Sequence, residues 1–556
     1  MRRPLPFEHE PLPPGDGRGV HLLPDLEVAG EQGRRTFRGA LPWAFVMNGG
    51  QQAVTLLVSM VLAAVVGPAV YGLVAMANVY IAFLDMLLQQ GMVPAIVQRK
   101  DLQEAHLDTA FWLVMASGVV LPLSGIALSG WWADVNRMPD LAPVIVALSA
   151  LLPIRSLVVV QDAILRRAMD FRALAFRTNL SALAGGAVGI SMALQGYGVW
   201  SLVAQQLTAA ATEVLVLWTA SRWRPRVRFS VRAARELLSF TSGSALSSMG
   251  AFIHTRADAL LIGLFFGPTA VGLYRLAAKL VESLKTLAIK TLQAVSLPEL
   301  SRFQDNPRVF NERFLDIVRF STWVAAPLFG ALALTSGPLV SLLGEEWAGS
   351  AAAITALSLV GFSSALGGFS GSILQALGRP HLLAVLTWTA AGLSAGGFAV
   401  AGFWLLDANE AQQVLGMAIS RVVVVAVLLL TINIAVVMKL TSVRLAQLRR
   451  AVGPPLTAGS LIVLMVSAAR WLWGAWLTSA LADLALTLSL LLVATACSLF
   501  VLEPRVRPLV MQTLTALRAT KSSALQDRQA GAVPDAARHH PPQVLLPETG
   551  PTDVTP

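Results

Sequence analysis

Four cations and one acid lie within a single apolar stretch in the second half of the sequence: Arg275, Lys279, Lys285, Lys290 and Glu282. All except Lys285 recur at near-helical steps, which places them on one face of a helix. A charged side chain inside a membrane helix costs about 2.5 to 3.5 kcal/mol unless a partner or a water-filled cavity receives it. Ammonium and guanidinium groups are strong donors to phosphate oxygens. The pattern therefore predicts a helix whose basic face lines a cavity and binds a phosphate-containing ligand.

A structural explanation of the same residues stays open. Arg275 and Lys279 are long enough to extend along the helix toward one membrane surface, and Lys290 toward the other. Lys279 also stands three residues before Glu282, a spacing that allows an ion pair on one helix face. Under this interpretation the basic face stabilises the helix and binds no ligand.

A second group of polar residues lies in the preceding apolar stretch, at His254, Arg256 and Asp258. His254 and Asp258 share a helix face, whereas Arg256 points elsewhere. Arg256 is either half of a packed arginine–carboxylate pair between helices or a contact to a phosphate group. His254 is more typical of a buried polar residue with a hydrogen-bond partner than of a proton carrier.

The first half of the sequence offers fewer charges within its apolar stretches. Asp85 is the one charge in a polar stripe along its predicted helix. Arg155 and Asp162 are seven residues apart and are predicted to share a helix face, either as a structural pair or as part of a cavity lining. Arg421, at the start of a later apolar stretch, is predicted to extend toward a membrane surface.

Four carboxylates are available inside the apolar stretches: Asp85, Asp162, Asp258 and Glu282. A carboxylate in a dry site can take up a proton reversibly, so these four are candidates for proton or sodium coupling or for a gate.

Asp85 lies 18 residues after Gly67, and Lys285 lies 18 residues after Gly267. Each glycine begins a similar Gly-Pro turn. Asp85 and Lys285 are therefore expected to approach each other across a cavity in one conformation. The alternative is that a four-residue insertion in one copy precedes Lys285, in which case the residue that matches Asp85 is nearer Ile289.

Membrane helices must hold these residues, because the composition leaves little material for a soluble domain. Of 556 residues, 55% are hydrophobic and 13% are charged, whereas soluble domains carry about 25% charged residues. Apolar runs of about 20 residues, the length that crosses a bilayer, recur throughout the chain. The expected fold class is an all-α polytopic membrane protein with about fourteen spans, near residues 43–66, 70–93, 110–130, 143–164, 174–194, 199–219, 240–266, 270–296, 320–343, 351–377, 382–406, 412–437, 453–473 and 479–502.

The sequence contains none of the common motifs for nucleotide, zinc or serine chemistry. No stretch reads G-x-x-x-x-G-K-[ST], H-E-x-x-H or G-x-S-x-G. Cys497 is the single cysteine, which excludes a disulfide framework and a cysteine-based metal centre. We therefore expect no metal, no cofactor and no catalytic residue.

The positions of Lys and Arg predict the orientation of the spans. Basic residues collect in every second loop, whereas the intervening loops contain only Arg137 and Arg470. Cytoplasmic loops carry such an excess, so both termini are predicted to be cytoplasmic. The formal net charge of +10 suits anionic lipid and requires no nucleic acid. Residues 1–40 are expected to form a cytoplasmic tail and not a signal peptide, and residues 504–556 a disordered cytoplasmic tail.

An internal repeat relates the two halves of the chain. Residues 66–73 read VGPAVYGL and residues 266–273 read FGPTAVGL, with the Gly and Pro positions 200 residues apart. Six predicted spans separate the copies, so both have the same orientation, as in transporters built from two parallel repeats. We predict two pseudo-symmetric six-helix lobes, 41–236 and 237–440, around a central cavity, with two additional helices in 441–503.

Several strings within residues 37–439 carry a family resemblance: VQRKD at 97–101, TAFW at 109–112, GYGVWSLV at 196–203 and SRWRP at 221–225. The most specific are RAD at 256–258 and LIG at 261–263, which are followed by Gly267-Pro268 and by Gly272-Leu273-Tyr274. The chain resembles the oligosaccharide flippases of the polysaccharide transporter family, in the multidrug/oligosaccharidyl-lipid/polysaccharide superfamily. The resemblance implies alternating-access transport of a polyprenyl-diphosphate-linked glycan from the cytoplasmic to the outer leaflet of a bacterial inner membrane, for lipopolysaccharide or exopolysaccharide biosynthesis. It also implies membrane lipids and a polysaccharide polymerase with its export machinery as partners.

With this substrate, six cations become candidates for contacts to the diphosphate or glycan: Arg275, Lys279, Lys285, Lys290, Arg256 and Arg155. Three other function classes remain. A small-molecule exporter of the same superfamily would place acidic or aromatic residues in its cavity. A membrane glycosyltransferase or ligase would carry its reactive groups in a sizeable exterior loop, and the predicted exterior loops are short. A non-transporting scaffold would leave glycan translocation intact in its absence.

Overall fold

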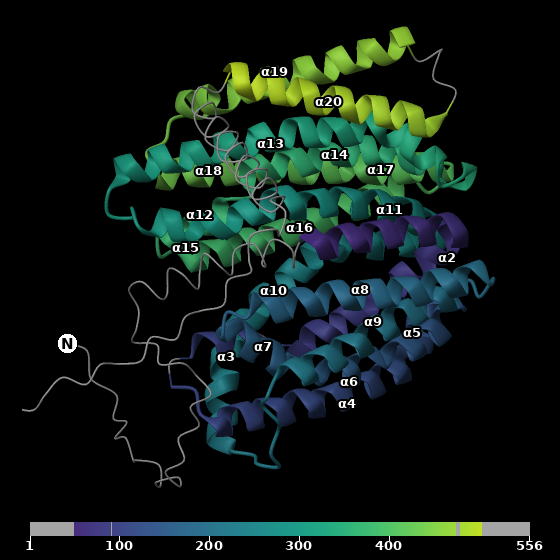
Figure 1. Cartoon of the computed structure of the whole chain (residues 1–556), viewed down its shortest axis with the longest axis vertical. Helices are drawn as coiled ribbons and strands as arrows, with labels where there is room; N and C mark the ends of the chain where they lie inside the picture. Colours follow the sequence, from purple (N-terminus) through teal and green to yellow (C-terminus); the bar gives the residue numbers. More distant parts are fainter. Residues whose placement is uncertain (1–48, 90–91, 100, 474–478, 503–556) are drawn as a thin grey trace, which may run out of the picture. The chain divides into compact units, whose positions relative to one another are not determined.

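The computed structural model describes residues 49–502 except 90–91, 100 and 474–478, and every regular element in this part of the chain is a helix (Figure 1). The two predicted tails, 1–40 and 504–556, lie outside the described residues. The helices of the first half are α2 (Gln51–Gln89), α3 (Met92–Gln98), α4 (Glu104–Val135), α5 (Leu141–Ser149), α6 (Leu151–Ser156), α7 (Val159–Arg167), α8 (Phe171–Leu194) and α9 (Val199–Ala220).

The second half contains the remaining helices, including two π-helical segments, η2 and η4, and a 3₁₀ turn, η3. They are α10 (Val231–Phe266), α11 (Pro268–Lys285), η2 (Thr286–Lys290), α12 (Thr291–Ser301), α13 (Pro307–Ser341), η3 (Glu345–Trp347), α14 (Ser350–Gly367), α15 (Ser370–Ala376), α16 (Pro380–Trp404), α17 (Glu410–Arg421), η4 (Val422–Leu429), α18 (Leu430–Leu440), α19 (Leu445–Trp473) and α20 (Ala480–Leu502).

The helices confirm the all-α polytopic fold class. Ten helical runs among the described residues are long and apolar enough to cross a membrane, and eleven if α5 to α7 count as one bent span. The sequence predicted about fourteen spans. The run Gln51–Gln98 covers the first two of these, and α8 and α11 do not meet the same combined criterion of length, hydropathy and number of charged residues. The described residues of all fourteen predicted segments nevertheless lie mainly in helices, with turns inside some of them, for example at residues 157–158 and 368–369.

The Gly-Pro repeat forms a sharp turn in both copies. Gly67 has φ +77° and Gly267 has φ +86°, a backbone region that side chains with a Cβ atom rarely adopt. Each is followed by a proline, whose fixed φ suits the first turn of the next helix. Gly67 therefore interrupts α2 within its length, and Gly267 separates α10 from α11.

The two copies of the repeat also lie directly against each other. A Cβ atom added to Gly72 would lie 1.8 Å from the carbonyl oxygen of Pro268, and one added to Gly272 would lie 1.9 Å from that of Pro68. Because glycine has no side chain, Gly72 and Gly272 allow the two helix backbones to approach this closely. The contact is reciprocal, as a two-fold relation between the repeats requires, and it closes the space between α2 and α11 at this end.

A tryptophan adds to the packing around the turn at Gly67 of α2. The Nε1 atom of Trp347 donates a hydrogen bond to the carbonyl oxygen of Ala63 at 3.2 Å. The Trp347 ring also meets that of Tyr71 edge to face, with centroids 5.8 Å apart. Trp347 is 1% exposed, so η3 is anchored against α2.

Polar contacts hold the start of α10 against the end of α3 and the start of α4. Glu236 accepts hydrogen bonds from Arg99 and, at 3.2 Å, from Nε2 of His106. The hydrogen bond from His106, with those from Arg232 and Arg99, lowers the pKa of Glu236 to about 2. Trp112 donates to the backbone of the preceding loop, at the carbonyl oxygen of Arg226, with a distance of 2.8 Å.

The helices α19 and α20 pack beside α13 (Figure 1). A small apolar cluster joins the three through Ile462, Val466 and Leu491, with Leu334 against it. Arg470 also bonds Asp483 at 2.7 Å across the α19–α20 hairpin. Arg470 was one of two basic residues in predicted exterior loops, and this pairing gives it a local structural partner.

Candidate functional site

A cavity of about 860 Å³ lies between helices of both halves of the sequence. This volume is in the upper part of the range for small-molecule sites, about 300 to 1,000 Å³. Its lining comes from α2, α6, α10, α11, η2, α14, α17 and η4. The lining contains seven Lys and Arg residues and three carboxylates: Arg155, Arg256, Arg275, Lys279, Lys285, Lys290, Arg421, Asp85, Asp258 and Glu282.

All six cations that the sequence singled out for ligand contacts line this cavity, and so do three of its four carboxylate candidates. The exception is Asp162, which is absent from the lining. Asp85 and Lys285, expected to approach each other, line the same cavity, but each forms its ion pair with a different residue in this structure. The charges of the lining therefore fall into groups that differ in how they are neutralised.

The first group joins α2 to α6. An NH1 nitrogen of Arg155 lies 3.1 Å from Oδ2 of Asp85, and the amide of Gln89 donates to the same oxygen at 3.0 Å. The carboxylate is mostly buried, with 16% of its side chain exposed. Arg155 and Asp85 therefore neutralise each other, and this group adds no net charge to the cavity lining.

The second group joins α10 to α17. Arg421 bonds Asp258 at 2.7 Å, and the Asp258 side chain is 2% exposed. The prediction that Arg421 extends to a membrane surface is wrong, because the aspartate one helix away holds its guanidinium in the cavity wall. An arginine inside an apolar run needs a partner, but the sequence did not identify which carboxylate supplies it. His254 beside this pair has a partner of its own, Ser394, at 2.9 Å.

The third group lies where α11 passes into η2. Glu282 holds two lysines, one at each carboxylate oxygen: Lys285, and Lys290 at 2.9 Å. The alternative pairing of Lys279 with Glu282 is therefore not the one formed. Since one carboxylate faces two ammonium groups, this group retains one positive charge.

The fourth group has no carboxylate partner at all among the described residues. Arg256, Arg275 and Lys279 line the cavity, and none of them forms an ion pair with a described acid. All three are partly buried. Arg256 is within electrostatic reach of Asp258 and Glu282, but both acids already bind other cations. The three cations therefore leave an excess of positive charge in the cavity, and this excess favours an anionic ligand.

Asp162 belongs to a different site in the first half. It bonds Arg177 at 2.7 Å and Arg166 at 2.5 Å, and Arg177 also bonds Glu213 at 2.8 Å. The prediction that Asp162 shares a face with Arg155 is wrong, because the helix breaks between α6 and α7 and the two segments differ in direction by 42°. Arg177 on α8 and Glu213 on α9 complete this site, and neither was among the predicted site residues.

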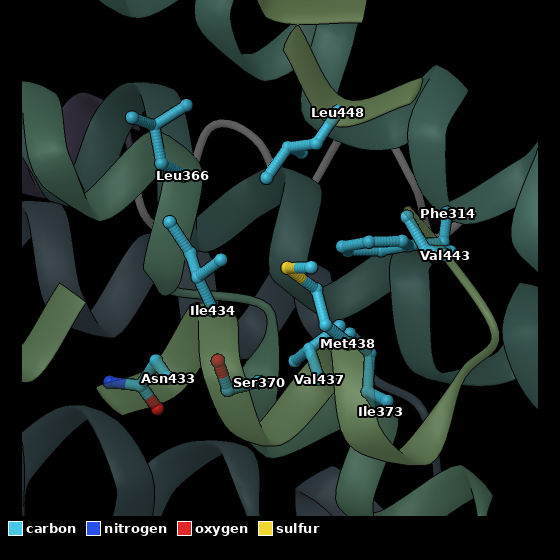
Figure 2. Close-up of a pocket in the computed structure, with 10 residues that line it drawn as sticks. All are labelled: Phe314, Leu366, Ser370, Ile373, Asn433, Ile434, Val437, Met438, Val443 and Leu448. Atoms are coloured by element: carbon cyan, nitrogen blue, oxygen red, sulfur yellow. The ribbon is translucent and has the colours of Figure 1, made fainter. Parts of the chain in front are cut away.

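A second recess, shown in Figure 2, lies among residues of α13, α14, α15, α18 and α19. It holds only about 10 Å³ and is lined by apolar side chains with Ser370 and Asn433. It has no charged residue in its lining and no room for a solute. The large basic cavity is therefore the candidate functional site.

Comparison with known proteins places the chain among polysaccharide biosynthesis proteins. It is similar to the succinoglycan biosynthesis transport protein ExoT of Rhizobium meliloti (strain 1021), with 25% identity over 309 residues, 55% of this chain and 62% of the relative. It is also similar to the lipopolysaccharide biosynthesis protein WzxC of Escherichia coli (strain K12), with 26% identity over 329 residues, 57% of this chain and 65% of the relative. The chain thus spans less than two thirds of the length of these relatives.

Solved structures show the same fold. A structure titled lipid II flippase MurJ, inward closed conformation, superposes with a TM-score of 0.66 at 10% identity, covering 84% of this chain and 99% of the other. A multidrug resistance MATE family transporter of the MOP superfamily, in an inward-facing conformation, gives a TM-score of 0.53 at 15% identity, covering 71% and 99%. At these identities the likeness concerns the fold alone. The family model described as "Polysaccharide biosynthesis protein" matches residues 61–352, so the chain belongs to that family of multi-pass membrane proteins.

Proposed function

We propose that this protein is a flippase that moves a polyprenyl-diphosphate-linked oligosaccharide from the cytoplasmic to the outer leaflet of a bacterial inner membrane. One observation carries the proposal: Arg256, Arg275 and Lys279 line a large cavity without an acidic partner among the described residues. Cations inside a membrane protein that lack an acidic partner usually face a water-filled cavity and mark the path of a substrate or ion. A diphosphate supplies the negative charge and the oxygen acceptors that these three side chains lack.

The remainder of the lining suits the glycan. Gln52, Asn78, Thr255, Thr286 and Ser364 present amide and hydroxyl groups to the same cavity. Such groups donate to and accept from sugar hydroxyls. The diphosphate therefore fixes the position of the substrate, and the neutral polar groups contact the sugars next to it.

Alternating access is the transport mechanism that this arrangement supports. The lobes 41–236 and 237–440 would move as units about the cavity, with both termini in the cytoplasm. The reciprocal contact of Gly72 and Gly272 closes one end between α2 and α11. Separation of these helices would open the cavity on that side, so the contact is a candidate gate.

The sign of the cavity charge favours this function over export of cationic drugs. Seven Lys and Arg residues face three carboxylates in the lining, and no Phe, Tyr or Trp is among the lining residues of the described part of the chain. A cation exporter requires the opposite balance or aromatic faces. Proton or sodium coupling remains a separate prediction, since Asp85, Asp258 and Glu282 each hold a cation that would have to be released first.

Substitution of the uncompensated cations tests the proposal directly. Lys279→Ala, Arg275→Ala and the double variant should reduce export of the lipid-linked glycan at least tenfold, with the glycan accumulating on the cytoplasmic leaflet and protein levels unchanged. Arg308→Ala provides a matched control, because Arg308 is a 90% exposed cation outside the cavity lining. Normal export in both single variants and in the double variant would disprove the proposed site.

A further inference from the structure

The basic face of α11 and η2 is longer than a diphosphate can span. Lys290 stands fifteen residues beyond Arg275, which corresponds to roughly 20 Å along a helix axis. The uncompensated cations Arg256, Arg275 and Lys279 form one group toward the start of α11, and Lys285 with Lys290 forms another at its far end. One diphosphate at the first group leaves the second untouched.

The two groups differ in what neutralises them. The first, here called the unpaired cluster, has no acidic partner among the described residues. In the second, here called the lysine pair, both ammonium groups of Lys285 and Lys290 bind Glu282. Glu282 places one oxygen on each lysine, which is also how two oxygens of a bound phosphate group would lie.

The lysine pair is open enough for a solute to reach it. The side chain of Glu282 is 49% exposed and that of Lys290 is 53% exposed, whereas that of Lys285 is 26% exposed, and all three line the cavity. An exposed ion pair is weak, with a typical contribution of about 0 to 1 kcal/mol. An anion with more charge than one carboxylate can therefore displace Glu282 at little cost.

We propose that the lysine pair is a second anion-binding site, in which Glu282 occupies the place of a phosphate until the substrate diphosphate displaces it. The inference rests on the proposed function and names a further position for the same substrate. The diphosphate binds the lysine pair and the unpaired cluster in turn, and Glu282 closes over the lysines again when the diphosphate moves on. Glu282 is thus a positioning residue that keeps the second site weak, so that the substrate is not held there.

Titration of the full-length protein with inorganic pyrophosphate tests this. In nanodiscs of uncharged phosphatidylcholine, isothermal calorimetry should resolve one tight pyrophosphate site in the wild type, at the unpaired cluster, because Glu282 competes for the lysine pair and keeps binding there weak. Glu282→Gln should bind two, because the amide is uncharged and leaves both lysines without a counter-ion. Glu346→Gln is the matched control, since Glu346 is an exposed carboxylate outside the cavity lining, and it should bind one.

Double variants assign the two sites. Glu282→Gln with Lys290→Ala should lose the second site and keep the first, whereas Glu282→Gln with Lys279→Ala should lose the first and keep the second. A Glu282→Gln protein that binds a single pyrophosphate with wild-type affinity would overturn the second site and leave the proposed function standing. A wild type that binds no pyrophosphate would contradict the proposed function itself. If Glu282→Gln does not purify as a folded protein, Glu282→Ala makes the same test.

Discussion

Two regions of this protein bury charge in opposite ways. Between α7, α8 and α9, Arg177 is 9% exposed and bonds both Asp162 and Glu213, while Arg166 bonds the second oxygen of Asp162. Two cations there balance two anions. In the central cavity, Arg256, Arg275 and Lys279 have no such balance among the described residues.

The difference separates charges that hold the fold from charges that hold a ligand. A buried ion pair that satisfies its own members fixes the helices that carry it, and loss of one member leaves the other uncompensated. Cations without an acid impose a cost on the empty protein, and an anionic ligand removes that cost when it binds. The first region should therefore respond to substitution in stability, and the second in ligand binding.

The largest effect is expected for Arg177→Ala. The variant leaves Asp162 and Glu213 with reduced compensation between α7, α8 and α9, so the free energy of unfolding should fall by about 3 to 5 kcal/mol. Denaturant unfolding in detergent measures the loss. Arg166→Ala is the control, because Arg166 is 39% exposed and follows Asp162 by one helical turn, so it should cost below about 1 kcal/mol. Equal stability of the Arg177 variant and the wild type would remove the distinction between the two regions.

A gain in stability is expected for Lys279→Met. Methionine keeps the length and volume of the side chain but removes a cation that has no acidic partner in the described structure. The free energy of unfolding should rise by up to about 2.5 kcal/mol, the lower limit of the insertion cost for a charge, while pyrophosphate binding is lost. Unfolding of the apo protein in detergent measures this. A less stable variant would mean that Lys279 supports the fold, and the comparison between the regions would then fail.

The smallest effect on stability is expected for substitution of Glu236, whose side chain is 33% exposed and which lies outside the predicted spans. Its pKa is about 2, below the ordinary value of 4.5. The stability that its ion pairs contribute is therefore fully present above pH 4.5 and is lost as the pH falls toward 2. Glu236→Gln should lower stability by below about 1 kcal/mol at neutral pH and reduce the loss between pH 4.5 and 2. Melting curves of both proteins across this range measure the difference, and parallel curves would argue against a role for Glu236.

The cavity lining shows how far sequence patterns reach. The spacing of Arg275, Lys279 and Glu282 was enough to predict a basic face on one helix, and all three line the cavity. The pattern failed at Arg155 and Asp162, where it assumed one straight helix. The break between α6 and α7 turns the second segment by 42°. Pro153 lies four residues before this break, but a proline alone fixes neither the position nor the angle of a bend.

The sequence pattern also could not predict which residues on different helices form ion pairs, because it does not specify how the helices are arranged. Arg421 and Asp258 are 163 residues apart, and Arg155 and Asp85 are 70 apart. Periodicity assigns a residue to a helix face, but the identity of the residue opposite depends on how each helix is rotated and where its neighbours pack. Neither quantity is encoded in the spacing of one helix.

The sequence by itself determined the class of the protein, the helical segments and the repeat, because these depend on apolar length and on Gly and Pro at fixed positions. Only the tertiary structure decided that Gly72 contacts Pro268. It also decided that Glu282 forms ion pairs with Lys285 and Lys290, whereas Lys279 forms none with an acid among the described residues. Pairing is a competition among all charges within reach of one another, and the packed helices alone set which charges are within reach.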